Sequence, residues 1–116
     1  MNQAERLDRT FAVLSDSTRR AMLARLEREE ALSVSDLARP HAIKLPAIMK
    51  HLDVLADAGL ITRSKTGRTV TVRLQPRPMR EAMEWLRRYE RFWSASLDRL
   101  TALAEARETE ARKSAR

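Results

Sequence analysis

The sequence predicts a mainly α-helical domain that carries one small β-hairpin. Apolar residues recur at steps of three and four along most of the chain, and this is the period of an α-helix. Between residues 61 and 74 the pattern changes to alternation in a run rich in Thr and Val, which is typical of strands. The chain has 116 residues and no internal repeat, a length that fits about one domain.

The first two predicted helices cover residues 3–14 and 17–28. In the first helix, Leu7 and Phe11 belong to an apolar face at helical spacing. The Ser-Asp pair before the second helix supplies a short side-chain oxygen, which accepts a hydrogen bond from a free amide at a helix start.

A third, short helix is predicted over residues 34–39. Ser33 and Asp36 resemble a capping box, because they lie three residues apart just before an apolar stretch. Pro40 ends this helix, since the residue before a proline disfavours the helical conformation.

The stretch LPAIMKHLDVLADAGLI predicts the fourth helix, over residues 45–58. Pro46 is tolerated in the first turn, where its missing amide breaks no helical hydrogen bond. Gly59 suits the left-handed residue that closes a helix. On a helical wheel one apolar stripe faces the core. It consists of Leu45, Ile48, Leu52 and Leu55.

The opposite face of this fourth helix is slim and basic at its front. Lys44 and Lys50 flank Pro46 and Ala47, whereas the acids of the helix lie further back. A helix that enters the major groove of DNA needs a slim front and a cation there. The alternative is a solvated helix whose outer face happens to carry one lysine. Met49 either packs at the margin of the core or touches a thymine methyl, and packing is favoured.

Residues 61–65 and 69–74 predict two strands that turn near Gly67. The segment 62–74 carries several cations and no acid. Uncompensated cations on a hairpin suit nucleic-acid phosphates, because each neutralised phosphate releases counterions. The alternative is an edge hairpin that its charges protect from aggregation. The cations are Arg63, Lys65, Arg68 and Arg73.

The order of these elements indicates a function. A short helix, a tight turn, a longer helix and a basic two-stranded ribbon form a helix-turn-helix with a wing. This arrangement predicts sequence-specific binding to double-stranded DNA. A winged helix that binds RNA or a protein partner is the alternative, and its cations would then serve a shape-based interface.

The sequence also resembles the ArsR/SmtB family of bacterial winged-helix repressors. The resemblance rests on FAVLSDSTRRAMLARLE, LSVSDLA, LPAIMKHLDVLADAGLI and GRTVTVRL, and it extends over about residues 4–100. It implies a homodimer that occupies an inverted-repeat operator and represses transcription. It also implies which side chains meet DNA. They are Ser33, Ser35, Lys44, Pro46, Ala47, Lys50, His51, Arg63, Lys65, Arg68 and Thr69.

The last predicted helix, residues 79–105, carries an apolar surface that is broad for one small domain. A second helix from a partner chain would cover it, with the first helix nearby. Ordinary packing within the monomer is one alternative. Another is a small hydrophobic effector bound between Trp85, Phe92 and Trp93. The predicted dimer interface comprises Leu7, Phe11, Leu86, Tyr89, Trp93, Leu97 and Leu100.

Composition argues against an enzyme, a cofactor or a metal sensor. The chain has no Cys, so it lacks disulfides and thiolate metal sites. Its only histidines, His41 and His51, have no third ligand at useful spacing. Two glycines are too few for a phosphate-binding loop. The family's known metal sites use Cys on the helix before the fourth one or His on the last helix, and both are missing here.

The remaining expectations concern charge and location. A net charge of +7 favours a polyanionic partner. No apolar run approaches the ~20 residues that span a bilayer, and the start of the chain has no signal-peptide core. We therefore expect a cytoplasmic protein without membrane contact. The domain is predicted to cover residues 1–105, followed by a charged, disordered tail over residues 106–116.

Overall fold

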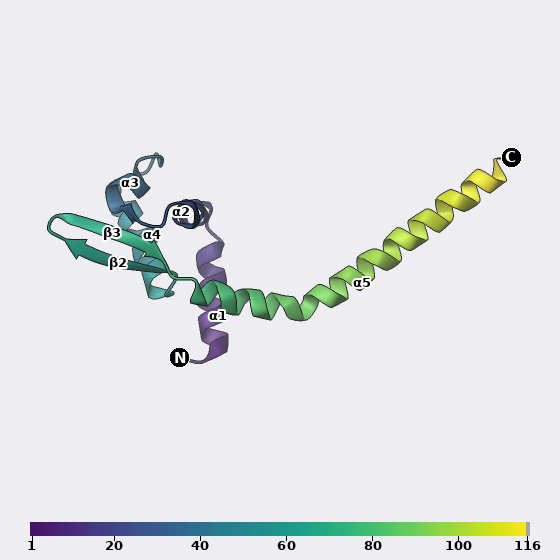
Figure 1. The fold of residues 1–116 in the computed structure, drawn as a ribbon, viewed down its shortest axis with the longest axis horizontal. Helices are drawn as coiled ribbons and strands as arrows, with labels where there is room; N and C mark the ends of the chain where they lie inside the picture. Colours follow the sequence, from purple (N-terminus) through teal and green to yellow (C-terminus); the bar gives the residue numbers. More distant parts are fainter. Residues whose placement is uncertain (116) are drawn as a thin grey trace. The chain divides into compact units, whose positions relative to one another are not determined.

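The computed structural model describes residues 1–115 and contains five helices and a three-stranded antiparallel sheet (Figure 1). The predicted fold class is thereby confirmed. The chain forms two compact units, Met1–Ala82 and the part of α5 from Met83 onward. In chain order the elements are α1 (Gln3–Leu14), α2 (Ser17–Arg28), β1 (Leu32–Ser33), α3 (Val34–Ala38), α4 (Leu45–Asp57), β2 (Ile61–Thr66), β3 (Thr69–Leu74) and α5 (Arg77–Ser114).

β2 and β3 form the predicted hairpin, and a third strand joins it. The strand order is β1-β3-β2, and both pairs are antiparallel. β1 has only two residues, with Leu32 opposite Val72 and Ser33 opposite Thr71. The sequence did not predict β1, because two residues are too few to display the alternation that marks a strand.

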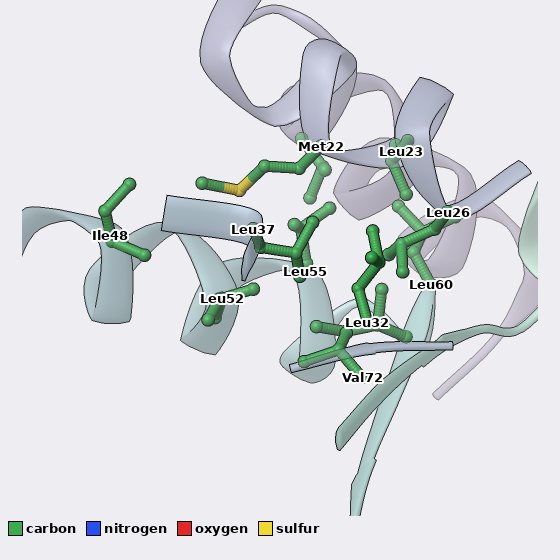
Figure 2. Packing of buried hydrophobic residues seen from close by; sticks show 12 residues of the cluster. Met22, Leu23, Leu26, Leu32, Leu37, Ile48, Leu52, Leu55, Leu60 and Val72 are labelled. Carbon is green, nitrogen blue, oxygen red and sulfur yellow. The ribbon is translucent and has the colours of Figure 1, made fainter. Parts of the chain in front are cut away.

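The core of the first unit lies between α2, α3, α4 and the sheet (Figure 2). Burying a side chain of the size of leucine stabilises the fold by about 1.5–3 kcal/mol. The side chains with no exposed surface are Met22, Leu37, Ile48, Leu52, Leu55, Leu60 and Val72. Because α4 contributes three of them, it is firmly attached to the rest of the unit.

The predicted core stripe of α4 is correct at three positions and wrong at the first. Ile48, Leu52 and Leu55 are buried, but Leu45 is 57% exposed. A helical wheel gives the direction of a side chain, but it does not say where along the helix the covering elements begin. Leu45 is the first residue of α4. Met49 packs against the core, as the favoured interpretation expected.

Short polar side chains start α2 and α3. The Asp16 carboxylate accepts a hydrogen bond from the amide of Arg19 at 3.0 Å. The Ser33 hydroxyl accepts one from the amide of Asp36 at 3.1 Å. Each bond satisfies one of the free amides at the helix start.

α4 ends in a turn that requires a glycine. Gly59 has a φ of +76°, its amide donates to the carbonyl of Ala56, and the next amide, of Leu60, donates to the carbonyl of Leu55. These two bonds form a Schellman motif, which leads the chain directly into β2. Gly67 has a φ of +62° in the turn between β2 and β3, as expected for the first central position of a type II′ turn.

α5 begins before residue 79 and continues to Ser114, so the predicted end of this helix near residue 105 is wrong. The segment beyond 105 is rich in Ala, Glu and Arg, which favour helix, and Arg112 pairs with Glu108 one turn earlier at 3.0 Å. The prediction relied on large apolar residues, which mark packing faces and not helix propensity. That residues 106–116 form a separate tail stays a prediction.

Candidate nucleic-acid interface

The start of α4 presents an exposed, slim and cationic surface. Lys44, Pro46 and Lys50 are exposed, and Ala47 is half-buried. Lys44 occupies the N-cap position, and no side chain caps the free amides of the first turn. The positive end of the helix dipole and a lysine at the same helix end both favour an anion.

The wing, defined here as residues 62–73, carries its cations on both faces. Arg63 and Lys65 lie two positions apart on β2 and therefore share one face. Arg63 is paired with the buried Val72, so this face continues into the core. Arg73, one position further along β3, lies on the other face. The predicted cations of the wing are exposed, but they do not form a single stripe.

Arg63 connects the wing to α4. Its Nη1 lies 2.7 Å from Oδ1 of Asp53, and the two side chains are 30% and 58% exposed. An exposed ion pair of this kind contributes only about 0–1 kcal/mol to stability. Its local effect is to neutralise an acid on the outer face of α4 and to hold the base of the wing beside that helix.

Four predicted site residues come together at one open hollow of about 220 Å³. Ser33 and Ser35 belong to the start of α3, and Arg68 and Thr69 belong to the turn of the wing. The Ser33 hydroxyl already accepts the capping hydrogen bond from the amide of Asp36. Ser35, Arg68 and Thr69 are exposed residues, and hydroxyl and guanidinium groups commonly donate to DNA phosphates.

His51 lies apart from the exposed cations. Its side chain is 21% exposed. The Nδ1 atom is 3.3 Å from Nη1 of Arg19 and 3.9 Å from Oδ2 of Asp16. The structure therefore places this predicted DNA contact against the junction of α1 and α2. On the helical wheel His51 stood at the boundary between the two faces, and the wheel could not show that α2 would cover it.

The carboxylate of Asp16 is held in its ionised form. The hydrogen bond from the backbone amide of Arg19 is the main cause that lowers the pKa of Asp16 from 3.8. Partial burial opposes this effect, while the charge of Arg19, and that of His51 when its imidazole is protonated, lower this pKa further.

Arg19, Asp16 and Asp53 are the polar partners that the sequence did not assign to the site. Asp16 was recognised only as one of two candidate helix caps. Arg19 and His51 are separated by 32 residues, and no local spacing predicts such a contact. The Asp53–Arg63 pair had a weak signal, since an acid on the outer face of α4 precedes an acid-free basic strand.

A second surface, the apolar face of α5, covers residues 83–103. Isolated exposed apolar side chains are ordinary, but a contiguous set on one helix marks an interaction surface. Phe92 and Trp93 make an edge-to-face contact and are 59% and 61% exposed, so no enclosed cavity surrounds them. The large exposed side chains are Met83, Leu86, Tyr89, Phe92, Trp93, Leu97, Leu100 and Leu103.

The two α1 residues of the predicted dimer interface differ from this set. Leu7 is only 8% exposed, because it packs within its own chain, and Phe11 is half-buried. Leu7 therefore offers little surface to a partner. Its apolar spacing in the sequence could not distinguish burial inside the monomer from burial between two chains.

Within residues 1–115, no three His, Asp or Glu side chains lie together in a way that could hold a metal ion. No helix in that part of the chain has both the length and the apolar character needed to cross a membrane.

Comparison with known proteins points in one direction. A family described as a helix-turn-helix domain matches residues 14–64. The chain is 34% identical over 90 residues to the HTH-type transcriptional regulator Rv2034 of Mycobacterium tuberculosis, covering 78% of this chain and 80% of that protein. It is also similar to the crystal structure of the ArsR family transcriptional regulator RHA00566, with 38% identity and a TM-score of 0.73 over 78% of this chain and 93% of the other. An ArsR-like transcriptional regulator from Rhodococcus sp. RHA1 is 32% identical with a TM-score of 0.66, covering 87% and 94% of the two chains.

Proposed function

This chain belongs to the ArsR family of winged helix-turn-helix transcriptional regulators, and we propose that it is a homodimeric repressor that binds an inverted-repeat operator in double-stranded DNA. As a DNA-binding regulator of this family it is not an enzyme. The observation that carries the proposal is the exposed and uncapped start of α4 beside an acid-free wing. A bacterial repressor of this kind acts in the cytoplasm, where the genome lies.

α4 is proposed to enter the major groove with its first turns. Pro46 and Ala47 have short side chains, so the helix backbone can approach base edges closely. Lys44 and Lys50 reach phosphate or guanine from this position. The acid Asp53 lies further along the helix and is paired with Arg63, so it does not repel the DNA backbone.

The wing and the start of α3 are proposed to hold the DNA backbone. Lys65 supplies a cation on the wing, and the hollow formed by Ser35, Arg68 and Thr69 accommodates a phosphate. Contacts of this class fix the position of the protein on the duplex and carry little sequence information. Sequence preference is then expected to come mainly from α4.

The apolar face of α5 supports the homodimer. Side chains such as Trp93, Leu97 and Leu100 are each about 60% exposed in the single chain. A second copy would cover them, and a twofold axis would present two copies of α4 to half-sites about one helical turn apart. Because Leu7 is buried in its own chain, α5 is expected to supply most of this interface.

DNA binding is proposed to be independent of metal ions. The family's known sensor sites use Cys, or His on the last helix. The chain has no Cys, and its last helix has no His. A small hydrophobic effector near Trp85, Phe92 and Trp93 stays a prediction without further support.

Selection of bound duplexes from random DNA tests the proposal, followed by footprinting of the recovered sequence. We expect protection of an inverted repeat. Lys50→Ala should weaken binding to the selected duplex by about 1–3 kcal/mol and relax the preference at the contacted base pairs. Lys113→Ala, an equal change of charge at the far end of α5, should leave that preference unchanged.

Each other outcome has a defined meaning. Equal affinity for the selected and scrambled duplexes would contradict a sequence-specific repressor. Stronger binding to RNA than to DNA would favour the alternative in which the winged helix contacts RNA. Binding to neither nucleic acid would favour the alternative in which it contacts a protein. Loss of operator binding after addition of a chelator such as EDTA would contradict independence from metal ions.

A further inference from the structure

The guanidinium of Arg19 joins three parts of the chain. Its Nε donates to the carbonyl of Val13 at 2.9 Å, and its Nη2 donates to the carbonyl of Ala12 at 3.2 Å. Both carbonyls lie in the last turn of α1, where they also accept weak bonds from the amides of Ser15 and Asp16, at 3.3 and 3.5 Å. Its Nη1 lies 3.3 Å from Nδ1 of His51, on α4. One planar side chain therefore ties the end of α1 to the proposed DNA-reading helix.

This contact defines how His51 is used. Since Arg19 has only donors, Nδ1 of His51 must accept, and the neutral imidazole then carries its proton on Nε2. Asp16 is the other charged group beside Nδ1, at 3.9 Å, and its carboxylate is itself held by the amide of Arg19. The cluster is partly buried, so its hydrogen bonds are less exposed to competition from water than those on the surface.

We infer that Arg19 is a positioning residue for DNA recognition, and that it fixes the front of α4 relative to α1 through Nδ1 of His51. The inference rests on the proposed function. It also changes the role of His51, which contributes through an internal hydrogen bond and not through contact with DNA. A small displacement of α4 would misalign base contacts and leave most phosphate contacts intact, so specificity should suffer more than non-specific affinity.

Two neutral substitutions of His51 separate the two roles. The side-chain oxygen of Asn lies near the position of Nδ1, whereas the amide of Gln reaches the position of Nε2. If His51 acts through Arg19, His51→Asn should retain binding to the selected duplex, and His51→Gln should lose about tenfold. If His51 contacts DNA through Nε2, the order of the two variants should be reversed, and this result would overturn the inference.

Arg19→Met completes the test, because it keeps an unbranched aliphatic side chain and removes all three donor nitrogens. We expect the ratio of affinities for the selected and scrambled duplexes to fall about tenfold. Arg19→Met combined with His51→Gln should lose no more than either change alone, since both remove the same hydrogen bond. Additive losses would contradict the coupling. Unfolding by urea identifies variants that are not fully folded at the temperature of the binding assay, and only folded variants are compared.

The control for a purely structural effect is Arg20→Met. Arg20 is an exposed neighbour whose Nη1 donates to the carbonyl of Leu14 at 2.7 Å, near the same helix end, and within residues 1–115 its side chain makes no hydrogen bond or ion pair with α4. This variant should keep the ratio of affinities. If wild-type protein shows no preference for any duplex, the proposed function itself fails. If wild-type protein is selective and Arg19→Met is equally selective, only the present inference fails.

Discussion

Asp16 illustrates how one residue serves two elements. Its carboxylate caps α2 through the amide of Arg19, and it also lies 3.9 Å from Nδ1 of His51 on α4. The sequence suggested the first role, since short polar residues favour helix starts. The second role depends on the way α2 and α4 pack together, which local spacing does not contain.

The lowered pKa of Asp16 predicts a pH-dependent contribution to stability. Because the folded-state pKa lies below 3.8, ionised Asp16 stabilises the fold above that pH, and this stabilisation is lost as the pH falls through the folded-state pKa. Asp16→Asn keeps a capping oxygen and removes the charge. The variant should therefore be less stable than wild type at neutral pH, and the difference should disappear in strong acid.

Urea unfolding of both proteins from neutral pH down to about pH 3 measures this difference. Asp98→Asn, an equal change of charge on exposed α5, provides the control for net charge. A stability difference between wild type and Asp16→Asn that is constant with pH would show that the carboxylate contributes only as a neutral cap.

Among elements, the predictable ones were those with several turns or several alternating residues. α4 and the hairpin were recognised from periodicity, and both glycine turns lie where the sequence placed them. β1 was missed because it has two residues, and its pairing with β3 is set by tertiary contacts. The end of α5 was missed because it depends on helix propensity and on an ion pair between Glu108 and Arg112.

The turn at Gly59 leads to a prediction about the connection from α4 to the wing. A Cβ at this position would have ordinary contact with Pro78, at 3.6 Å, so space is available. The backbone is left-handed, however, and Gly59→Ala should lower the free energy of unfolding by about 1–2 kcal/mol. Gly59→Asn should cost less, because asparagine tolerates this conformation better.

Chemical denaturation of the two variants beside wild type provides the measurement for Gly59. Equal losses for Gly59→Ala and Gly59→Asn would indicate that crowding matters and that the backbone conformation does not. DNA binding can then be measured in the Gly59 variants, in which the connection from α4 to the wing is altered and the residues at the start of α4 are unchanged.

At the scale of the whole molecule, the apolar face of α5 is a feature that the single chain leaves uncovered. The heptad spacing of Leu86, Trp93 and Leu100 allowed the sequence to predict this face, and the structure exposes all three side chains. Leu7, which was also predicted for the interface, is only 8% exposed in the single chain, and apolar spacing is the same whether a neighbour belongs to the same chain or to another.

Leu97→Glu combined with Leu100→Glu should convert the proposed dimer to monomers, since each copy would place two charges in an apolar interface. Sedimentation measures the change. Ala95→Glu with Ala102→Glu introduces the same charges on the opposite side of α5 and should leave the dimer intact. A dimer that survives the leucine changes would exclude this face as the interface.

The junction at Ser33 has a consequence for how such chains can vary in length. Ser33 pairs with Thr71 in the sheet and also caps α3, so no spacer separates the strand from the helix. Inserting a single residue there would shift the strand register and turn its side chains to the wrong face, or it would remove the cap. Insertions and deletions among natural relatives should therefore avoid this junction.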